Sequence, residues 1–148
     1  KEDRPLPMEE RVALSQKLIT HPKILVSDIE KDLGTSITYF VVRALKQNFP
    51  LTKFVWITGM DNALNLHKWH YWQDLLKEVC MAHLTRPPAT SLIRRSPLRM
   101  LNHQRHVVVK KGGRYPLDSG TTYWMLQKKM MNISSTELRK KESLKSKT

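Results

Sequence analysis

Two short apolar runs, each bounded by turn-forming residues, constrain the fold most. Lys53-Phe-Val-Trp-Ile-Thr58 ends at Gly59, and Cys80-Met-Ala-His-Leu-Thr85 stops before Arg86-Pro-Pro88. Continuous apolar runs of this length are typical of strands buried on both faces of a parallel sheet. Because helix-period segments alternate with them, the sequence predicts an α/β fold with a mostly parallel sheet and helices on both faces.

Further segments of both kinds flank these runs. The sequence predicts helices over Met8–Ile19, Thr38–Asn48 and Trp69–Val79, and strands over Lys23–Ile29, Arg105–Val109 and Thr122–Leu126. With 148 residues, 40% of them hydrophobic, the chain is long enough for one domain. We divide it into an α/β core over 1–88, a basic loop or insertion over 89–120, the last strand and helix of the same domain over 121–141, and a basic tail over 142–148.

The charge is strongly positive and unevenly distributed. Twenty-six Lys and Arg residues stand against thirteen Asp and Glu, for a formal net charge of +13, and most of the excess follows Arg86. Such a field attracts polyanions without selecting a base sequence, although a solvated basic surface would have the same composition. The candidate RNA contacts are Arg94, Arg95, Arg99, Arg105, Lys110, Lys111 and Arg114.

Cysteine and histidine usage narrows the chemistry. The single cysteine, Cys80, excludes an internal disulfide and a multi-cysteine zinc site. His67 and His70, like His103 and His106, lie three positions apart, but no convincing third ligand follows either pair, so we predict no metal site. No stretch approaches the roughly 20 apolar residues of a membrane helix, so we expect no membrane association.

The stretch Asn132-Ile-Ser-Ser-Thr-Glu-Leu-Arg-Lys-Lys141 predicts the start of the last helix. A hydroxyl near Ser134 and the carboxylate of Glu137 form a capping-box pattern. The same free N–H groups, hydroxyls and Arg139 also suit a phosphate group. From these residues alone, an ordinary capped helix and a phosphate site both stay open.

Three stretches together resemble the bacterial nicotinate-nucleotide adenylyltransferases. They are Phe54-Val-Trp-Ile-Thr-Gly-Met-Asp-Asn62, Leu66-His-Lys-Trp-His-Tyr-Trp72 and Ile133-Ser-Ser-Thr-Glu-Leu-Arg139, in the family's order and approximate spacing. Pro7–Glu30 and Thr85-Arg-Pro87 also look like that family, most closely its alphaproteobacterial branch. The resemblance spans nearly the whole chain and is weakest over 89–120.

The resemblance implies a Rossmann-like nucleotidyltransferase fold and the transfer of AMP from ATP, with Mg²⁺, to nicotinate mononucleotide. Gly59 and Asp61 would face the ATP ribose at the carboxyl end of a central strand. Trp69 would stack on the pyridine ring, and Thr38 would contact the substrate. The ATP phosphates would be held by Ser134, Ser135, Thr136 and Arg139.

Simpler interpretations of these residues remain. Trp69 and Trp72 could be ordinary packing aromatics, and Asp61-Asn62 could cap the following helix. The sequence also departs from the family's pattern. The family's Gly-Gly-x-Phe-Asn-Pro-x-His-x-Gly-His turn is absent from these 148 residues, and Ile37-Thr-Tyr-Phe-Val41 replaces the family's Tyr-Thr-x-Asp-Thr.

Three functions stay open, in this order. The first is a non-catalytic component of a ribonucleoprotein such as the mitochondrial ribosome, without a cofactor, in which RNA and protein partners cover an open sheet. The second is part of an active adenylyltransferase in NAD biosynthesis, in a bacterial cytoplasm, that uses ATP and Mg²⁺. Its His-x-Gly-His motif would then be lost by processing, carried on a separate polypeptide, or absent from the 148 residues. The third is a nucleotide-binding scaffold without chemistry.

Overall fold

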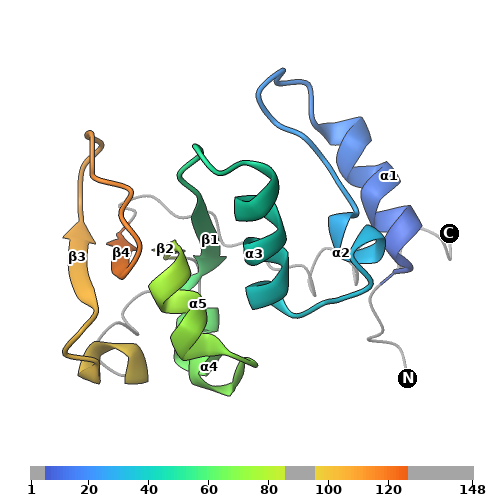
Figure 1. Ribbon diagram of the computed structural model, residues 1–148. Helices are drawn as coiled ribbons and strands as arrows, with labels where there is room; N and C mark the ends of the chain where they lie inside the picture. Colours follow the sequence, from blue (N-terminus) through green and yellow to red (C-terminus); the bar gives the residue numbers. More distant parts are fainter. Residues whose placement is uncertain (1–5, 86–95, 127–148) are drawn as a thin grey trace, which may run out of the picture. The chain divides into compact units, whose positions relative to one another are not determined.

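The computed structural model describes residues 6–85 and 96–126 (Figure 1). The chain divides into two compact units, and the boundary between them falls between Ser36 and Ile37. The first unit is helical, and the second contains a parallel sheet.

The first unit contains α1 (Met8–Leu18) and α2 (Ile29–Asp32). Pro7 precedes α1, and Glu9 and Glu10 in its first turn suit the positive end of the helix dipole. Lys31 of α2 forms an ion pair with Glu9 at 3.0 Å. Gly34 ends α2 with a φ of +62°, a left-handed conformation that a residue without Cβ adopts at little cost.

The predicted strand over Lys23–Ile29 is wrong. Residues 24–28 belong to no helix or strand, and Ile29 already begins α2. Leu25 is 89% exposed, so its apolar side chain packs against little. A strand needs a neighbour for its backbone hydrogen bonds, and among the described residues this segment has none.

The second unit supplies the sheet. Its helical elements are α3 (Thr38–Asn48), α4 (Met60–Asn65), the 3₁₀ turn η1 (Leu66–Lys68), α5 (Trp72–Glu78) and the 3₁₀ turn η3 (Pro97–Met100). Its strands are β1 (Val55–Gly59), β2 (Cys80–Leu84), β3 (Arg105–Val109) and β4 (Thr121–Met125). The strand order is β1-β2-β4-β3, and every pair is parallel. The predicted α/β fold with a parallel sheet is therefore confirmed.

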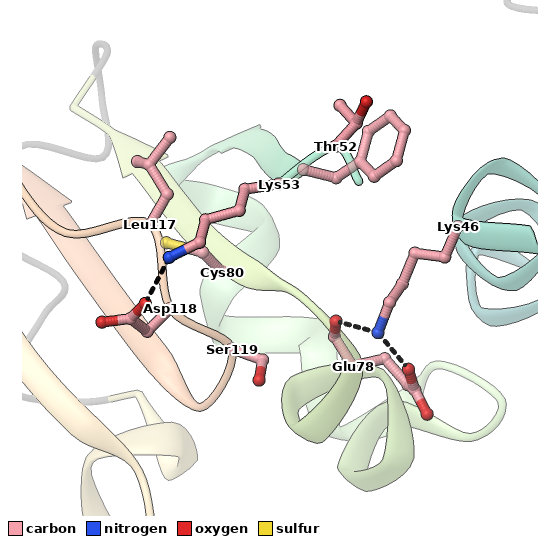
Figure 2. A pocket seen from close by; sticks show the side chains of 9 residues that line it. Lys46, Thr52, Lys53, Glu78, Cys80, Leu117, Asp118 and Ser119 are labelled. Atoms are coloured by element: carbon pink, nitrogen blue, oxygen red, sulfur yellow. Dashed lines mark hydrogen bonds and ion pairs between the residues drawn. The ribbon is translucent and has the colours of Figure 1, made fainter. Parts of the chain in front are cut away.

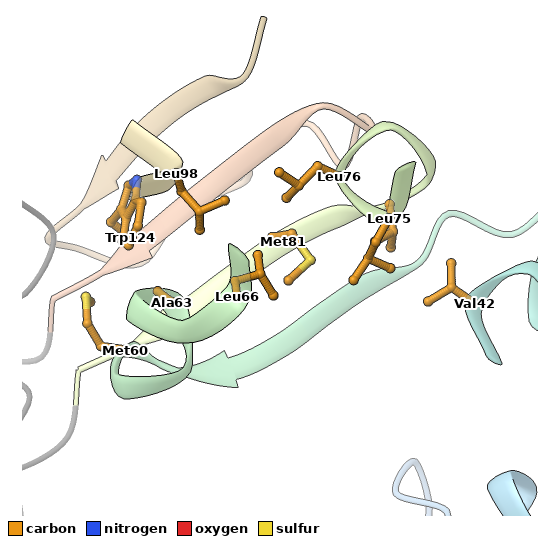
Figure 3. Close-up of a cluster of buried hydrophobic side chains, with 10 residues drawn as sticks. Val42, Met60, Ala63, Leu66, Leu75, Leu76, Met81, Leu98 and Trp124 are labelled. Carbon is orange, nitrogen blue, oxygen red and sulfur yellow. The ribbon is translucent and has the colours of Figure 1, made fainter. Parts of the chain in front are cut away.

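The main core lies on one face of this sheet. Side chains alternate between the two faces of a strand, so Trp56 and Thr58, Met81 and His83, and Thr122 and Trp124 share a face. Figure 3 shows Leu66, Leu75 and Leu76 gathered with Met81 and Trp124, and α3 adds Val42 to the same cluster. The described helices α3, α4 and α5 thus bury one face of the sheet.

The second face carries the connection from β3 to β4, residues 110–120. The Tyr123 hydroxyl donates to the Pro116 carbonyl, and Lys53 pairs with Asp118 at 2.9 Å. Gly120 N donates to Leu76 O at 2.9 Å, which ties the end of this connection to α5. The same face carries a smaller apolar cluster, which contains Cys80, Ala82, Val109 and Tyr123.

The prediction that strand 53–58 is buried on both faces is wrong on one face. Ile57 is 64% exposed, whereas β2, which was also predicted to be buried, has four buried residues out of five. The reason is topological. In the part of the chain that the structure describes, β1 is an edge strand with β2 on one side only.

Candidate nucleotide site

The candidate site begins where β1 ends and α4 starts. Gly59 pairs with Leu84 of β2, and Met60 is already helical, so the turn between strand and helix is very tight. Asp61 lies in the first turn of α4, where a carboxylate suits the helix dipole. The N-cap of α4 is Gly59, so Asp61-Asn62 does not supply the cap. Gly59 and Asp61 were expected at a central strand, but in this sheet β1 lies at the edge.

Behind Gly59, a histidine and a threonine from neighbouring strands are hydrogen-bonded. Thr58 Oγ1 lies 2.6 Å from His83 Nδ1, and the Thr58 hydroxyl donates to the Gly59 carbonyl at 3.2 Å. A Thr58 hydroxyl that donates to Gly59 leaves its oxygen to accept from His83 Nδ1, and in this tautomer of His83, Nε2 is an unprotonated acceptor.

Trp124 lies between two imidazoles. Its ring centroid is 5.1 Å from that of His83 and 5.9 Å from that of His106, with interplanar angles of 36° and 30°. Trp124 Nε1 donates to His106 Nδ1 at 3.2 Å. This bond assigns the proton of neutral His106 to Nε2.

Three buried polar atoms of this region have no hydrogen-bond partner among the described residues: His83 Nε2, His106 Nε2 and Gln104 Oε1. Gln104 uses its amide nitrogen to donate to Thr122 at 2.8 Å. Burial lowers the pKa of His83 from 6.5 to about 4, with a smaller effect of nearby His106. Burial also lowers the pKa of His106, together with the positive charge of Arg99. Both imidazoles are therefore neutral at pH 7.

An aromatic cluster follows Thr38 at the start of α3. The rings of Tyr39 and Tyr71 stack at 5.3 Å, and Phe40 meets Tyr71 edge-on at 5.2 Å. The Arg43 guanidinium lies 5.7 Å from the Tyr39 centroid, a cation–π distance. Tyr71 has a φ of 58°, which is unusual for a bulky residue. Phe40 and Tyr71 are 38% and 51% exposed, so part of this cluster faces solvent.

The two tryptophans of the second resemblance stretch are packed. Trp69 and Trp72 are half-buried against the main core, as the simpler interpretation expects. The predicted helix over Trp69–Val79 begins only at Trp72, because Tyr71 adopts its left-handed conformation before α5. Trp69 therefore lies in the short link between η1 and α5, two residues from the exposed ring of Tyr71.

The basic candidates divide between described and undescribed segments. Arg94 and Arg95 lie outside the described residues, as do Ser134, Ser135, Thr136 and Arg139. The remaining five are exposed and lie on η3, β3 and the segment that follows: Arg99, Arg105, Lys110, Lys111 and Arg114. They are thus available to a polyanion.

A surface cleft of about 230 Å³ lies at the amino ends of β1 and β2 (Figure 2). Lys46 and Glu78 pair at 2.5 Å and Lys53 and Asp118 at 2.9 Å along its wall, so its charges are largely neutralised from within. The cleft contains none of the predicted nucleotide-binding residues. Nucleotides bind parallel sheets at the opposite, carboxyl edge, and we therefore assign it no nucleotide.

Two further findings concern the described part of the chain. Within residues 6–85 and 96–126, no three His, Cys, Asp or Glu side chains are grouped to hold a metal ion. No helix in those same ranges is long and apolar enough to cross a membrane.

Three features were not predicted from the sequence: the His83–Thr58 pair, the position of Trp124 between two imidazoles, and the pairing of Arg43 with Tyr39. One signal was present. Thr58 in β1 and His83 in β2 are the polar side chains of otherwise apolar strands, and each is next to last in its strand. Aligning the two parallel strands by their ends would have put them side by side.

The model of the cytidylyltransferase-like family matches residues 1–141 of this chain. The chain belongs to this family. A probable nicotinate-nucleotide adenylyltransferase of Cereibacter sphaeroides is 29% identical over 135 residues, which cover 91% of this chain and 71% of that protein. One from a Ruegeria species is 30% identical over 141 residues, which cover 95% of this chain and 75% of that protein. One from Ruegeria pomeroyi is 30% identical and is covered over 63% of its length.

This member of the cytidylyltransferase-like family is a nucleotidyltransferase-like domain with nicotinate-nucleotide adenylyltransferase relatives, which confirms the resemblance derived from the sequence. The reported relatives are bacterial proteins, and none of their names refers to RNA, a ribosome or a mitochondrion.

Proposed function

We propose that this chain binds nicotinate mononucleotide and ATP as the nucleotide-binding part of a nicotinate-nucleotide adenylyltransferase. The observation that carries this proposal is the tight turn from β1 into α4 at the carboxyl edge of a parallel sheet, with Gly59 at the turn and Asp61 one residue into the helix. The choice of substrates is supported by relatives named probable nicotinate-nucleotide adenylyltransferases, which this chain matches over most of their length.

Each part of the proposed site has a physical role. Gly59 has no side chain, so a ligand can approach its backbone, and the Asp61 carboxylate can accept hydrogen bonds from ribose hydroxyls. Trp69 and the exposed rings near Tyr71 offer flat faces to a pyridine ring. Arg43 adds a positive charge beside these rings that attracts a carboxylate or a phosphate.

The described residues do not form a Mg²⁺ site made of protein ligands alone, because no three His, Cys, Asp or Glu side chains among them are grouped to hold a metal ion. In phosphoryl-type chemistry this ion is commonly bound by the substrate's phosphates and one or two carboxylates. We therefore assign no Mg²⁺ ligand to this chain. The His-x-Gly-His motif is absent from these 148 residues, so ligand binding and not turnover is the appropriate test.

The test is calorimetric titration of the full chain with nicotinate mononucleotide and, separately, with ATP. Trp69→Leu keeps an apolar side chain against the core but removes the aromatic face, so we expect about three- to tenfold weaker binding of nicotinate mononucleotide. Trp69→Phe is the matched control and should bind within about twofold of wild type. Absence of binding to wild type at millimolar ligand would reject the proposed function.

The exposed basic residues favour a second candidate, a non-catalytic RNA-binding component of a ribonucleoprotein. Arg105 begins β3, Lys110 and Lys111 follow its end, and the chain carries a net charge of +13. Sedimentation of the native protein from an extract, with and without ribonuclease, tests this candidate. A large particle that collapses with ribonuclease supports it, and a small species unaffected by ribonuclease rejects it.

A charge-removal series gives the second candidate a quantitative prediction. Replacing Arg99, Arg105, Lys110 and Lys111 with Ala should weaken binding to single-stranded RNA and lower the slope of log affinity against log salt by about 0.7 for each lost phosphate contact. Lys77→Ala, an exposed lysine on α5, is the control and should leave the slope unchanged. An unchanged slope in the fourfold variant would show that this segment does not contact RNA.

A further inference from the structure

We propose that His83 is a positioning residue that acts through the Thr58 hydroxyl to hold the Gly59 peptide in place at the entrance to α4. This inference rests on the proposed function, because it concerns the turn that we assign to the nucleotide. In this proposal, His83 does not contact the ligand. Its effect is transmitted through two hydrogen bonds.

The geometry of the two bonds carries the proposal. Thr58 and His83 are register partners in β1 and β2 and point to the same face of the sheet. His83 Nδ1 lies 2.6 Å from Thr58 Oγ1, which is short for a nitrogen–oxygen hydrogen bond. The Thr58 hydroxyl then donates to the carbonyl of Gly59 at 3.2 Å. The relay therefore runs from β2, through β1, to the peptide that enters α4.

Stability alone does not explain a histidine at this position. His83 is completely buried, and its Nε2 has no partner among the described residues. A buried imidazole with an unpaired nitrogen costs free energy, and a leucine would avoid that cost among Met81, Trp124 and the other apolar neighbours. A residue that is costly for folding and bonded toward a proposed ligand turn is better explained by its effect on that turn.

Gly59 is the residue that most needs such a restraint. Glycine loses more conformational freedom on ordering than any other residue, and Gly59 ends an edge strand that β2 supports on one side only in the described sheet. Fixing its carbonyl also fixes the peptide that carries the Met60 N–H and sets the direction of the first turn of α4. A turn that is ordered before the nucleotide arrives binds it more tightly, because less entropy is lost on binding.

The experiment compares three variants of the full chain. His83→Leu removes the donor and keeps the bulk, Thr58→Val removes the hydroxyl and keeps the shape, and His83→Asn places an amide N–H near the position of Nδ1. Two properties are measured for each: affinity for ATP and nicotinate mononucleotide by calorimetry, and hydrogen exchange of the backbone amides at the start of α4, including Met60 and Asp61. Chemical unfolding at pH 7 checks that the fold is intact.

We expect His83→Leu and Thr58→Val each to weaken nucleotide binding about five- to tenfold and to speed amide exchange at the start of α4 by a similar factor. The double variant should be no worse than either single one, because both break the same relay. His83→Asn should recover most of the affinity. His83→Leu should unfold at the same or a higher denaturant concentration than wild type.

The outcomes separate this inference from the proposed function. If wild type binds nucleotide and His83→Leu binds equally well with unchanged exchange, the relay is rejected and the proposed function stands. If wild type binds neither nucleotide, the proposed function fails and amide exchange alone decides the relay. Unchanged exchange in both His83→Leu and Thr58→Val rejects it, and faster exchange in both, restored by His83→Asn, supports it.

Discussion

Acidification from pH 7.5 to pH 4 will lower the free energy of unfolding by about 3 kcal/mol through His83 alone. Burial lowers the pKa of this imidazole from 6.5 to about 4 in the folded protein. A depressed pKa means that the unfolded chain binds the proton more readily than the folded one. The contribution of neutral His83 to the free energy of unfolding is therefore complete above pH 6.5 and is lost as the pH falls from 6.5 toward 4. A shift of this size corresponds to about 3 kcal/mol.

The measurement is urea unfolding of wild type and His83→Leu at intervals between pH 4 and pH 7.5. His106 titrates in the same direction, since burial also lowers its pKa, so the difference between the two proteins isolates His83. We expect the difference in stability between the two proteins to be constant above pH 6.5 and to grow in acid in favour of His83→Leu. An identical pH dependence in both proteins would show that His83 is not buried as a neutral group.

Replacement of Trp124 by Ala will lower the free energy of unfolding by about 3–5 kcal/mol, a large fraction of the stability of an ordinary domain. Trp124 is a completely buried residue of β4, belongs to the main core with Met60, Leu98 and Met81, and donates to His106. The substitution removes an aromatic ring from a close-packed site and leaves a cavity. It also leaves His106 Nδ1 without its donor.

Two variants give this prediction its controls. Trp124→Phe keeps most of the ring but loses the N–H donor, so it should cost about 1–2 kcal/mol. Ile57→Ala is made at a position that is 64% exposed on edge strand β1, and should cost less than about 1 kcal/mol. Unfolding midpoints by circular dichroism will rank the three. If Trp124→Ala unfolds no more easily than Ile57→Ala, then β4 is not the centre of the core.

Local signals predicted some elements to the residue. The helix Thr38–Asn48 and the strand Arg105–Val109 have the predicted bounds, because periodicity and flanking residues act within the segment itself. The prediction of a strand over Lys23–Ile29 was wrong, because a strand depends on a partner that lies far along the chain. The predicted start of α5 was wrong, because Tyr71 adopts a left-handed conformation before the helix, and no local rule predicts this conformation for tyrosine.

The candidate site was also predicted from the sequence only in part. The order of motifs placed Gly59 and Asp61 after a strand, and the structure has both at the carboxyl end of β1. Trp69 was predicted as a stacking residue, and the structure adds that it is half-buried against the core. The predicted phosphate residues around Ser134 lie outside the described segments, so their role stays a prediction.

By itself, the sequence determined the family, the parallel α/β architecture and the excess of positive charge, because these follow from motif order, apolar runs and composition. Only the tertiary structure decided the strand order β1-β2-β4-β3 of the described sheet, the bond between His83 and Thr58, and the position of Trp124 between two imidazoles. The reason is physical. Strand register and order join residues 25 positions apart, such as Thr58 and His83, and burial then sets the pKa of the imidazole.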